Sequence, residues 1–153
     1  AIDKLSHFGT FIPFKTNGLV YEAVSGHPDL FFCQVDDDQW VMAPNTPEKY
    51  KKLFEKEKIK VQTGKNAVGK TYPQTTLYNA VLTDQYLIHH QKYTDDNIKH
   101  LITGKTVIHV KQAYTRCNLL PLSQEKFITS DKGIYKTLLK SGLETHYFSP
   151  RGI

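Results

Sequence analysis

The sequence is poor in cysteine, methionine and tryptophan, and it contains no long apolar run. Among the 153 residues are 2 Cys, 1 Met and 1 Trp. Cys33 and Cys117 are too few for a disulfide framework, which favours a reducing, cytoplasmic setting. No apolar run approaches the ~20 residues that a membrane-spanning helix needs, so no membrane partner is predicted.

The net charge is positive, but the basic residues form no nucleic-acid motif. Lys and Arg number 20 against 15 Asp and Glu, which gives a formal net charge of +5. The densest group of lysines, at residues 49–60, is interleaved with Glu48, Glu55 and Glu57, as on a solvated helix face. Because no basic and aromatic run matches a binding module, no nucleic-acid partner is predicted. A composition of 39% hydrophobic and 23% charged residues predicts one globular domain over residues 1–153.

Three stretches of the chain have the same order of apolar, turn and helical segments. The first comprises two strands, a helix that begins at Thr46-Pro47 and a closing strand, at residues 30–35, 40–43, 46–54 and 59–61. The second has the same order, with Thr94 as the helix cap, at residues 77–82, 86–88, 94–102 and 107–110. The third has Ser130 or Asp131 as the cap, at residues 117–122, 127–128, 130–139 and 143–148. Each stretch therefore predicts a ββαβ unit.

Such units predict an α/β protein in which several sheets pack together. One unit alone would expose an apolar sheet face, so the units must pack around a shared axis or in a row. The start of the chain predicts half a unit, with a helix end at Ala1 to Ser6, a stop at Gly9 and a strand from Thr10 to Phe14. The predicted units cover residues 1–24, 25–64, 72–112 and 114–150, about three and a half units, and the chain is expected to be a piece of a longer protein.

Several phrases of the chain resemble the guanidino-group-modifying enzymes, or penteins, and in particular a bacterial branch of unassigned function. These phrases are Tyr21 to Asp29, Val68 to Pro73, Tyr78 to Val81, Ile88 to Asp95, Val110 to Cys117 and Ile128 to Ile134. The resemblance implies an α/β-propeller of five ββαβ units, of which about three and a half are present. It further implies a hydrolase or transferase that acts on a guanidine, an amidine or an amino-acid-like small molecule, without a cofactor. An open ring would also favour self-association.

The characterised penteins use a Cys of the last unit to attack the guanidinium carbon. Carboxylates hold the planar cation through paired hydrogen bonds, and a His serves as acid and base. In this chain the last one and a half units are expected to be missing, together with a Cys of that kind.

The predicted catalytic residues are His27, Asp29, His90 and Cys117. His27 and Asp29 precede the first strand, where they suit an acid–base group and a cation anchor, although Asp29 can equally cap a turn. Adjacent strand residues point to opposite faces, so at most one of His89 and His90 enters a cavity. No third ligand accompanies this pair, and no metal is predicted. Cys117 is either a nucleophile or a small core residue.

The predicted substrate-binding residues are Asn79, Lys111, Arg116, Asn118 and Asp131. Asn79 and Asn118 begin equivalent strands, where each either faces the cavity or satisfies buried backbone groups. Lys111 and Arg116 suit a substrate carboxylate and would lower the pKa of Cys117. Asp131 either binds substrate or caps a helix.

Two other functions remain open from the sequence. Gly64 to Thr71 fits the phosphate-loop pattern G-x-x-x-x-G-K-[ST], which would make the protein a nucleotide-binding enzyme. Tyr72-Pro73 follows at once, however, where a phosphate loop requires a helix. A propeller that binds a small ligand without catalysis is the other alternative.

Overall fold

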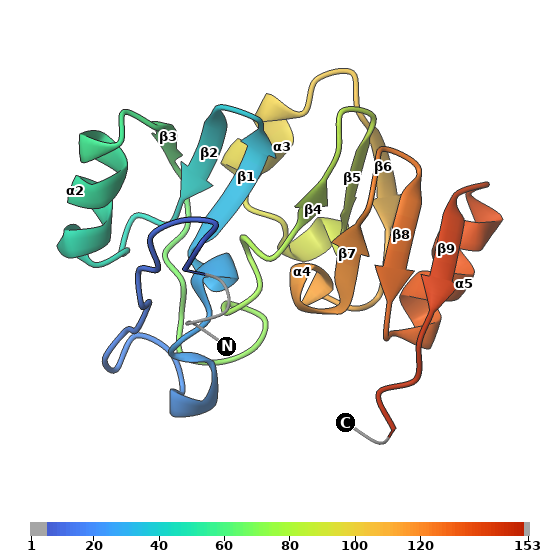
Figure 1. Ribbon diagram of the computed structural model, residues 1–153, viewed down its shortest axis with the longest axis horizontal. Helices are drawn as coiled ribbons and strands as arrows, with labels where there is room; N and C mark the ends of the chain where they lie inside the picture. The colour runs from blue at the N-terminus through green and yellow to red at the C-terminus, as the bar shows by residue number, and fades with distance from the viewer. Residues whose placement is uncertain (1–5, 152–153) are drawn as a thin grey trace.

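Three small three-stranded sheets follow one another along the chain (Figure 1). The computed structural model describes residues 6–151. The first sheet contains β1 (Phe32–Asp36), β2 (Gln39–Met42) and β3 (Lys60–Thr63), and the second contains β4 (Val81–Leu82), β5 (Tyr86–His89) and β6 (Thr106–His109). The third contains β7 (Leu119–Pro121), β8 (Lys126–Thr129) and β9 (Glu144–Tyr147). The predicted α/β content is confirmed.

The three sheets share one topology. In each, the first two strands pair antiparallel and the last two pair parallel. A parallel pair requires a crossover, and a helix provides it each time: α2 (Glu48–Lys56), α3 (Asp96–Leu101) and α5 (Lys132–Lys140). The remaining helical segments are α4 (Thr115–Asn118) and the 3₁₀ turns η1 (Glu22–Val24), η2 (Pro28–Leu30) and η3 (Gln91–Tyr93). Within residues 6–151, no helix combines the length and the apolarity needed to cross a bilayer.

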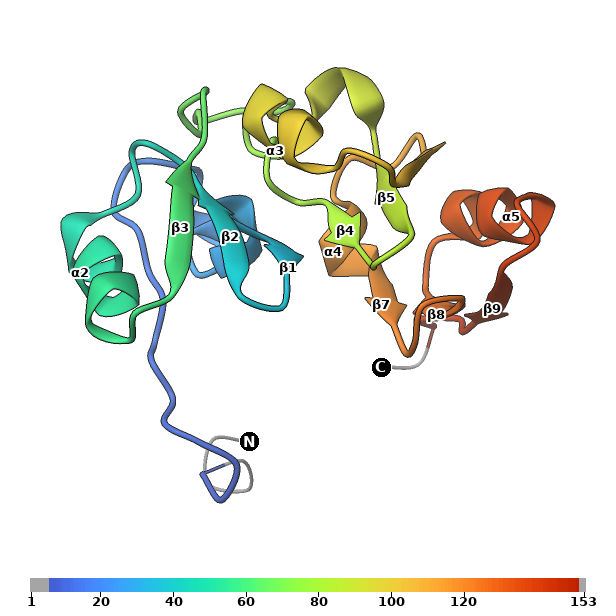
Figure 2. The same cartoon turned by 90° about the horizontal axis from the view of Figure 1, so that it is seen from above.

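The first strand of each sheet lies toward the middle of the molecule. Figure 2 shows β1, β4 and β7 near one another, with α2 and α5 at the two ends of the row of sheets. Two apolar clusters join the sheets. One contains Phe31, Tyr78 and Ile98 and lies between the first two sheets, and the other contains Ile88 and Phe127 and lies between the last two. Burial of these side chains fixes the inner ends of the three sheets relative to one another.

Three predicted strands differ from the structure. Thr10 to Phe14 forms no strand, because its backbone pairs with no neighbouring strand, and the Tyr50 hydroxyl donates to the Pro13 carbonyl instead. The strand predicted from residue 77 is shortened to β4, because the amide of Asn79 closes a turn on the Thr76 carbonyl. The strand predicted from residue 117 begins as the helical turn α4. The helix predicted over Ala1 to Ser6 falls almost wholly outside the described residues.

The helix caps were predicted in part. Asp131 caps α5, because its Oδ1 accepts the amide of Ile134 at 2.8 Å. The cap of α3 is Asp95 rather than Thr94, whose hydroxyl bonds to His89. Helix α2 begins one residue later than expected, at Glu48, with Pro47 in the cap position.

Candidate functional site

Four of the predicted site residues meet at one place. His27 and Asp29 belong to the turn η2 before β1, Asn79 precedes β4, and Cys117 lies in α4 before β7. Because β1, β4 and β7 lie toward the middle of the molecule, the segments that lead into them converge (Figure 2). The three sheets therefore each contribute a side chain to the same site.

The thiol of Cys117 and the carboxylate of Asp29 are the centre of this site. Cys117 Sγ donates to Asp29 Oδ2 at 3.0 Å. Asn79 Nδ2 donates to the same oxygen at 2.8 Å and to the sulfur at 3.4 Å. His27 Nδ1 lies 3.8 Å from the sulfur and 3.7 Å from Asp29 Oδ1. A thiol, a carboxylate and an imidazole thus face one another.

Asn79 connects the groups of the site through hydrogen bonds. It is fully buried, and its Oδ1 accepts the amides of Arg116 at 2.9 Å and Cys117 at 3.4 Å. Its Nδ2 faces Asp29 and Cys117, as described above. Asn79 therefore satisfies buried backbone groups at one end, as one of the two predicted alternatives has it, and at the other end donates to Asp29 and Cys117; it does not line the cleft described below.

The surroundings of Cys117 favour the protonated form of its thiol. Partial burial of the sulfur raises the pKa of Cys117 to about 12, and the hydrogen bond to Asp29 and the charge of its carboxylate act in the same direction. Asn79 and Arg116 oppose the rise but do not cancel it. The sequence predicted that Lys111 and Arg116 lower this pKa, whereas the net shift is upward, because burial and Asp29 outweigh the charge of Arg116.

A cleft of about 600 Å³ adjoins the site. Residues of β1, β4 and β7 line it, and Asp29 and Arg116 reach it from the site. Its walls include Phe32 and Trp40. A volume of this size suits a small molecule, and a carboxylate and a guanidinium in one cleft suit a ligand with charges of both signs.

The other predicted site residues lie elsewhere. His90 stacks on Tyr93 with ring centroids 4.1 Å apart and packs edge-on against His109. Lys111 is exposed. Asn118 donates to the carbonyl of Tyr114, and Asp131 caps α5. Asn118 was grouped with Asn79 by its position before a strand, but α4 directs its side chain back onto its own turn.

His89 is a buried, neutral histidine of the second sheet. Its Nε2 donates to the Ala113 carbonyl at 2.8 Å, so Nδ1 accepts from the Thr94 hydroxyl at 2.8 Å. Burial lowers the pKa of His89 from 6.5 to about 4. This residue is part of the core and not of the site.

The folded protein should therefore lose stability in mild acid. Between pH 6.5 and about 4 the unfolded chain binds a proton at His89 that the folded chain does not bind, so stability falls as the pH falls. We expect His89→Gln to lower the stability at pH 7 and to reduce the pH slope by up to about 1.4 kcal/mol per pH unit. Urea unfolding between pH 7 and pH 4.5 measures the slope.

The control variant is His100→Gln, at an exposed position, and it should leave the slope of stability against pH unchanged. An unchanged slope in His89→Gln would contradict the assignment of His89 as a buried, neutral histidine.

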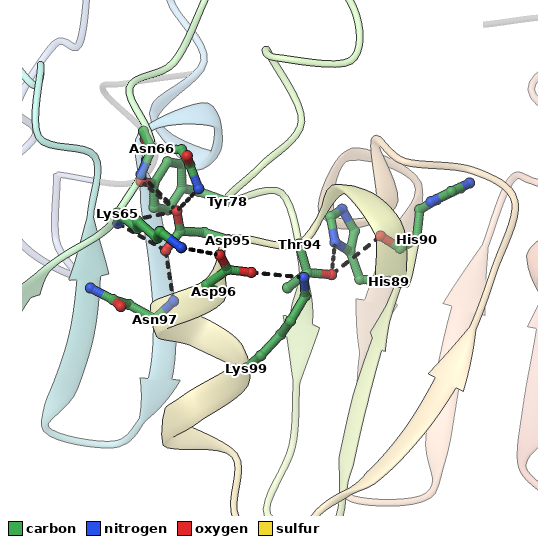
Figure 3. A network of polar contacts seen from close by, with 10 residues as sticks. All are labelled: Lys65, Asn66, Tyr78, His89, His90, Thr94, Asp95, Asp96, Asn97 and Lys99. Atoms are coloured by element: carbon green, nitrogen blue, oxygen red, sulfur yellow. Dashed lines mark hydrogen bonds and ion pairs between the residues drawn. The ribbon is translucent and has the colours of Figure 1, made fainter.

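The segment with the phosphate-loop pattern binds a carboxylate of the protein itself (Figure 3). The buried Asp95 accepts the backbone amides of Lys65 at 3.1 Å and Asn66 at 2.9 Å. It also accepts the amide of Asn97 at 3.0 Å and the hydroxyl of Tyr78 at 3.3 Å. The backbone amides that would hold a phosphate are therefore occupied.

The rest of this segment also departs from a nucleotide site. No helix begins at Thr71, since β4 is the next regular element after β3 in the described chain. Gly64 is needed for another reason, because a Cβ at this position would overlap the hydroxyl of Tyr78. Lys70 is exposed. The nucleotide-binding alternative is thus left without the geometry that it requires.

Sequence reasoning missed the tyrosines beside the site. The hydroxyl of Tyr114 lies 2.5 Å from the Thr75 hydroxyl and 3.4 Å from that of Tyr21. Burial raises the pKa of Tyr114 to about 12, and the nearby Cys117 adds to the rise. The signal was present in the sequence, because Tyr114 stands only three residues before Cys117.

The comparisons with known proteins agree with this architecture. No curated protein matches the chain. A solved structure, described as SxtG, an amidinotransferase from Microseira wollei in the saxitoxin biosynthetic pathway, is similar with a TM-score of 0.54. The two are 12% identical over 78% of this chain and 41% of that one, so the likeness concerns the fold alone. The model of a family of unknown function, DUF6873, matches residues 1–153, and the chain belongs to that family.

Proposed function

We propose that this chain is part of a pentein-type propeller that acts as a hydrolase or transferase at the carbon of a guanidine or amidine. The observation that carries this proposal is the contact of Cys117 Sγ with Asp29 Oδ2, with His27 beside both. The fold of the amidinotransferase neighbour supports it. Cys117 takes the role of the nucleophile, in place of a Cys in a later unit. Free thiols at Cys33 and Cys117 suit a cytoplasmic location.

The carboxylate of Asp29 would bind the cationic group of the substrate. A planar guanidinium or amidinium donates paired hydrogen bonds to a carboxylate, and Asp29 is accessible, with 24% of its side chain exposed. A cation at this place would offset the charge that raises the pKa of Cys117, so the substrate itself would promote ionisation of the thiol.

The chemical step then needs only groups of this site and the substrate. The thiolate of Cys117 forms a bond to the central carbon, and the substrate amine leaves as its bond to that carbon breaks. His27, 46% exposed and with Nδ1 3.8 Å from the sulfur, takes up the proton that the thiol loses and passes it to the leaving amine. Water, or a second amine in a transferase, then displaces the sulfur. The side chain of Arg116 in the adjoining cleft would bind the carboxylate of an amino-acid-like substrate.

A pair of alkylating reagents tests this proposal. Chloroacetamidine carries an amidinium beside its chloromethyl carbon, and chloroacetamide is the neutral counterpart. The preference is the ratio of the alkylation rate with chloroacetamidine to the rate with chloroacetamide, measured with a chelator present. We expect this ratio to be about 10- to 100-fold higher for Cys117 than for the free thiol of glutathione, since a charge-assisted hydrogen bond contributes about 1.5–3 kcal/mol. Mass spectrometry of the intact protein and of its peptides measures both rates.

A Cys117→Ser variant locates the effect. Cys117→Ser should abolish the fast labelling, because the buried Cys33, whose pKa is raised to about 12 by burial, does not react. If Cys117 and glutathione had the same ratio of rates for the two reagents, the proposal would be overturned. Saturable binding of a guanidine without preferential labelling would instead favour a propeller that binds a small ligand without catalysis.

A further inference from the structure

We propose that His27, Asp29 and Cys117 form a binding site for one divalent cation of the zinc class. One ligand atom from each residue, the imidazole Nδ1 or Nε2, a carboxylate oxygen and the sulfur, lies within 4.8 Å of the other two. The inference uses the residues of the proposed active site, but it does not depend on any reaction there. It also departs from the sequence, which predicts no metal.

The spacing of these donors suits a tetrahedral ion. Zinc bonds of about 2.0–2.3 Å place two ligand atoms of one tetrahedron about 3.3–3.8 Å apart. The imidazole Nδ1 of His27 lies 3.8 Å from Cys117 Sγ and 3.7 Å from Asp29 Oδ1. The sulfur and Asp29 Oδ2 are closer, at 3.0 Å, because a proton joins them now. Replacement of that proton by a metal ion requires the sulfur and Oδ2 to separate by a few tenths of an ångström, and the Asp29 carboxylate to turn so that the same oxygen faces His27.

The mixture of donors selects the kind of cation. Magnesium and calcium bind oxygen ligands, whereas sulfur and imidazole nitrogen with one carboxylate suit zinc and its soft or borderline relatives. The site has no second thiol for the closed sulfur-rich coordination of structural zinc. With His27 46% and Asp29 24% exposed, water can take the fourth position. Three protein ligands and one open position are typical of an exchangeable metal ion.

The surroundings already orient two of the ligands. Asn79 Nδ2 donates to Asp29 Oδ2 at 2.8 Å and to Cys117 Sγ at 3.4 Å. Such hydrogen bonds to ligand atoms hold them in place and strengthen metal binding. In turn, Asn79 Oδ1 is fixed by the amides of Arg116 and Cys117. Asn79 is thus a positioning residue and not a ligand.

Binding can be written as an exchange of a proton for a metal ion. The thiol of Cys117 loses its proton to solvent, and its sulfur forms a bond to the cation, while Asp29 and neutral His27 bind through lone pairs. No oxidation state changes. A sulfur bonded to the metal shares a lone pair with the cation and is a weaker nucleophile, so the cation should slow the alkylation of Cys117 by neutral and cationic reagents alike.

Cobalt and zinc ions are the probes for the test. Chelator-treated protein is titrated with Co²⁺ alone, and we expect a thiolate-to-cobalt charge-transfer band at one ion per chain, which Zn²⁺ abolishes by displacement. Competition of Zn²⁺ with a chromogenic chelator measures affinity. Cys117→Ser, His27→Ala and Asp29→Asn should each weaken zinc binding by at least about 100-fold, and Asn79→Ala by about 10- to 100-fold.

A matched control separates this site from scattered surface histidines. His146 lies 3.3 Å from Glu144 on exposed β9, so it offers an imidazole and a carboxylate without a thiol. His146→Gln should leave zinc binding unchanged. Circular dichroism shows whether each variant folds, and Cys117→Ser, at an exposed position, is the decisive one.

The proposal is overturned by the absence of a charge-transfer band, by a band that survives in folded Cys117→Ser, or by an equal loss of binding in His146→Gln. The amidine-labelling experiment uses metal-free protein, so a lack of preferential labelling there would not bear on the outcome of the metal titration. Conversely, selective labelling without zinc binding would support the proposed reaction and refute the metal site.

Discussion

Replacement of Asp95 by Ala should lower the free energy of unfolding by about 3 kcal/mol or more. The carboxylate of Asp95 is fully buried and accepts from the amides of Lys65, Asn66 and Asn97 and from the hydroxyl of Tyr78. The substitution removes the charged acceptor of three partly buried backbone amides, and a hydrogen bond to a charged group contributes about 1.5–3 kcal/mol. Urea unfolding at pH 7 measures the change.

The neighbouring Asp96 provides a matched control. Its carboxylate is partly exposed and pairs with Lys65 at 2.9 Å and Lys99 at 3.1 Å (Figure 3). Solvent screens such surface pairs, so they contribute little to stability and Asp96→Asn should have a small effect. A loss in Asp95→Ala no greater than that in Asp96→Asn would mean that the loop does not depend on Asp95.

Asp29→Asn is expected to change the reactivity of Cys117 in two opposite ways. The carboxylate raises the pKa of Cys117, so without it the thiol ionises more readily and reacts faster with neutral chloroacetamide near pH 7. At the same time the cation anchor is lost, so the preference for chloroacetamidine should fall by about 10- to 100-fold. The labelling rates of metal-free protein with both reagents, measured from pH 6 to pH 9, test both effects.

Asp84→Asn is the control for this change. Asp84 lines the same cleft, but it pairs with Gln124 at 2.8 Å and does not contact Cys117 in the described structure. Its substitution should leave the preference for the amidine intact. If both variants lost the preference equally, the cleft would attract the cation by its general charge, and Asp29 would have no special role.

The order of the elements could be predicted from the sequence because the pattern that encodes it is local. Strands such as β2 and β8 are short apolar runs between polar turns, and a glycine follows α3 and α5 closely, at Gly104 with φ 87° and Gly142 with φ 80°. Apolar spacing, turn residues and glycines with positive φ need no distant partner to be recognised.

The elements that were predicted wrongly depend on distant contacts. The strand predicted from residue 117 begins instead as α4, where the side chain of Asn79 accepts the backbone amides of Arg116 and Cys117. The phosphate-loop pattern likewise holds locally, and only the fold shows that Asp95, about 30 residues away, occupies its amides. A pattern in one segment cannot show which group of another segment satisfies it.

The sequence by itself determined the three strand–helix units and the candidates His27, Asp29, Asn79 and Cys117, because each stands at a recognisable place beside a strand. Only the tertiary structure decided that these four meet and that His90, Asn118 and Asp131 do not join them. Asp29 and Cys117 are 88 residues apart in the chain. Their contact arises from apolar packing between the sheets, a cooperative and long-range effect that leaves no mark in the sequence around either residue.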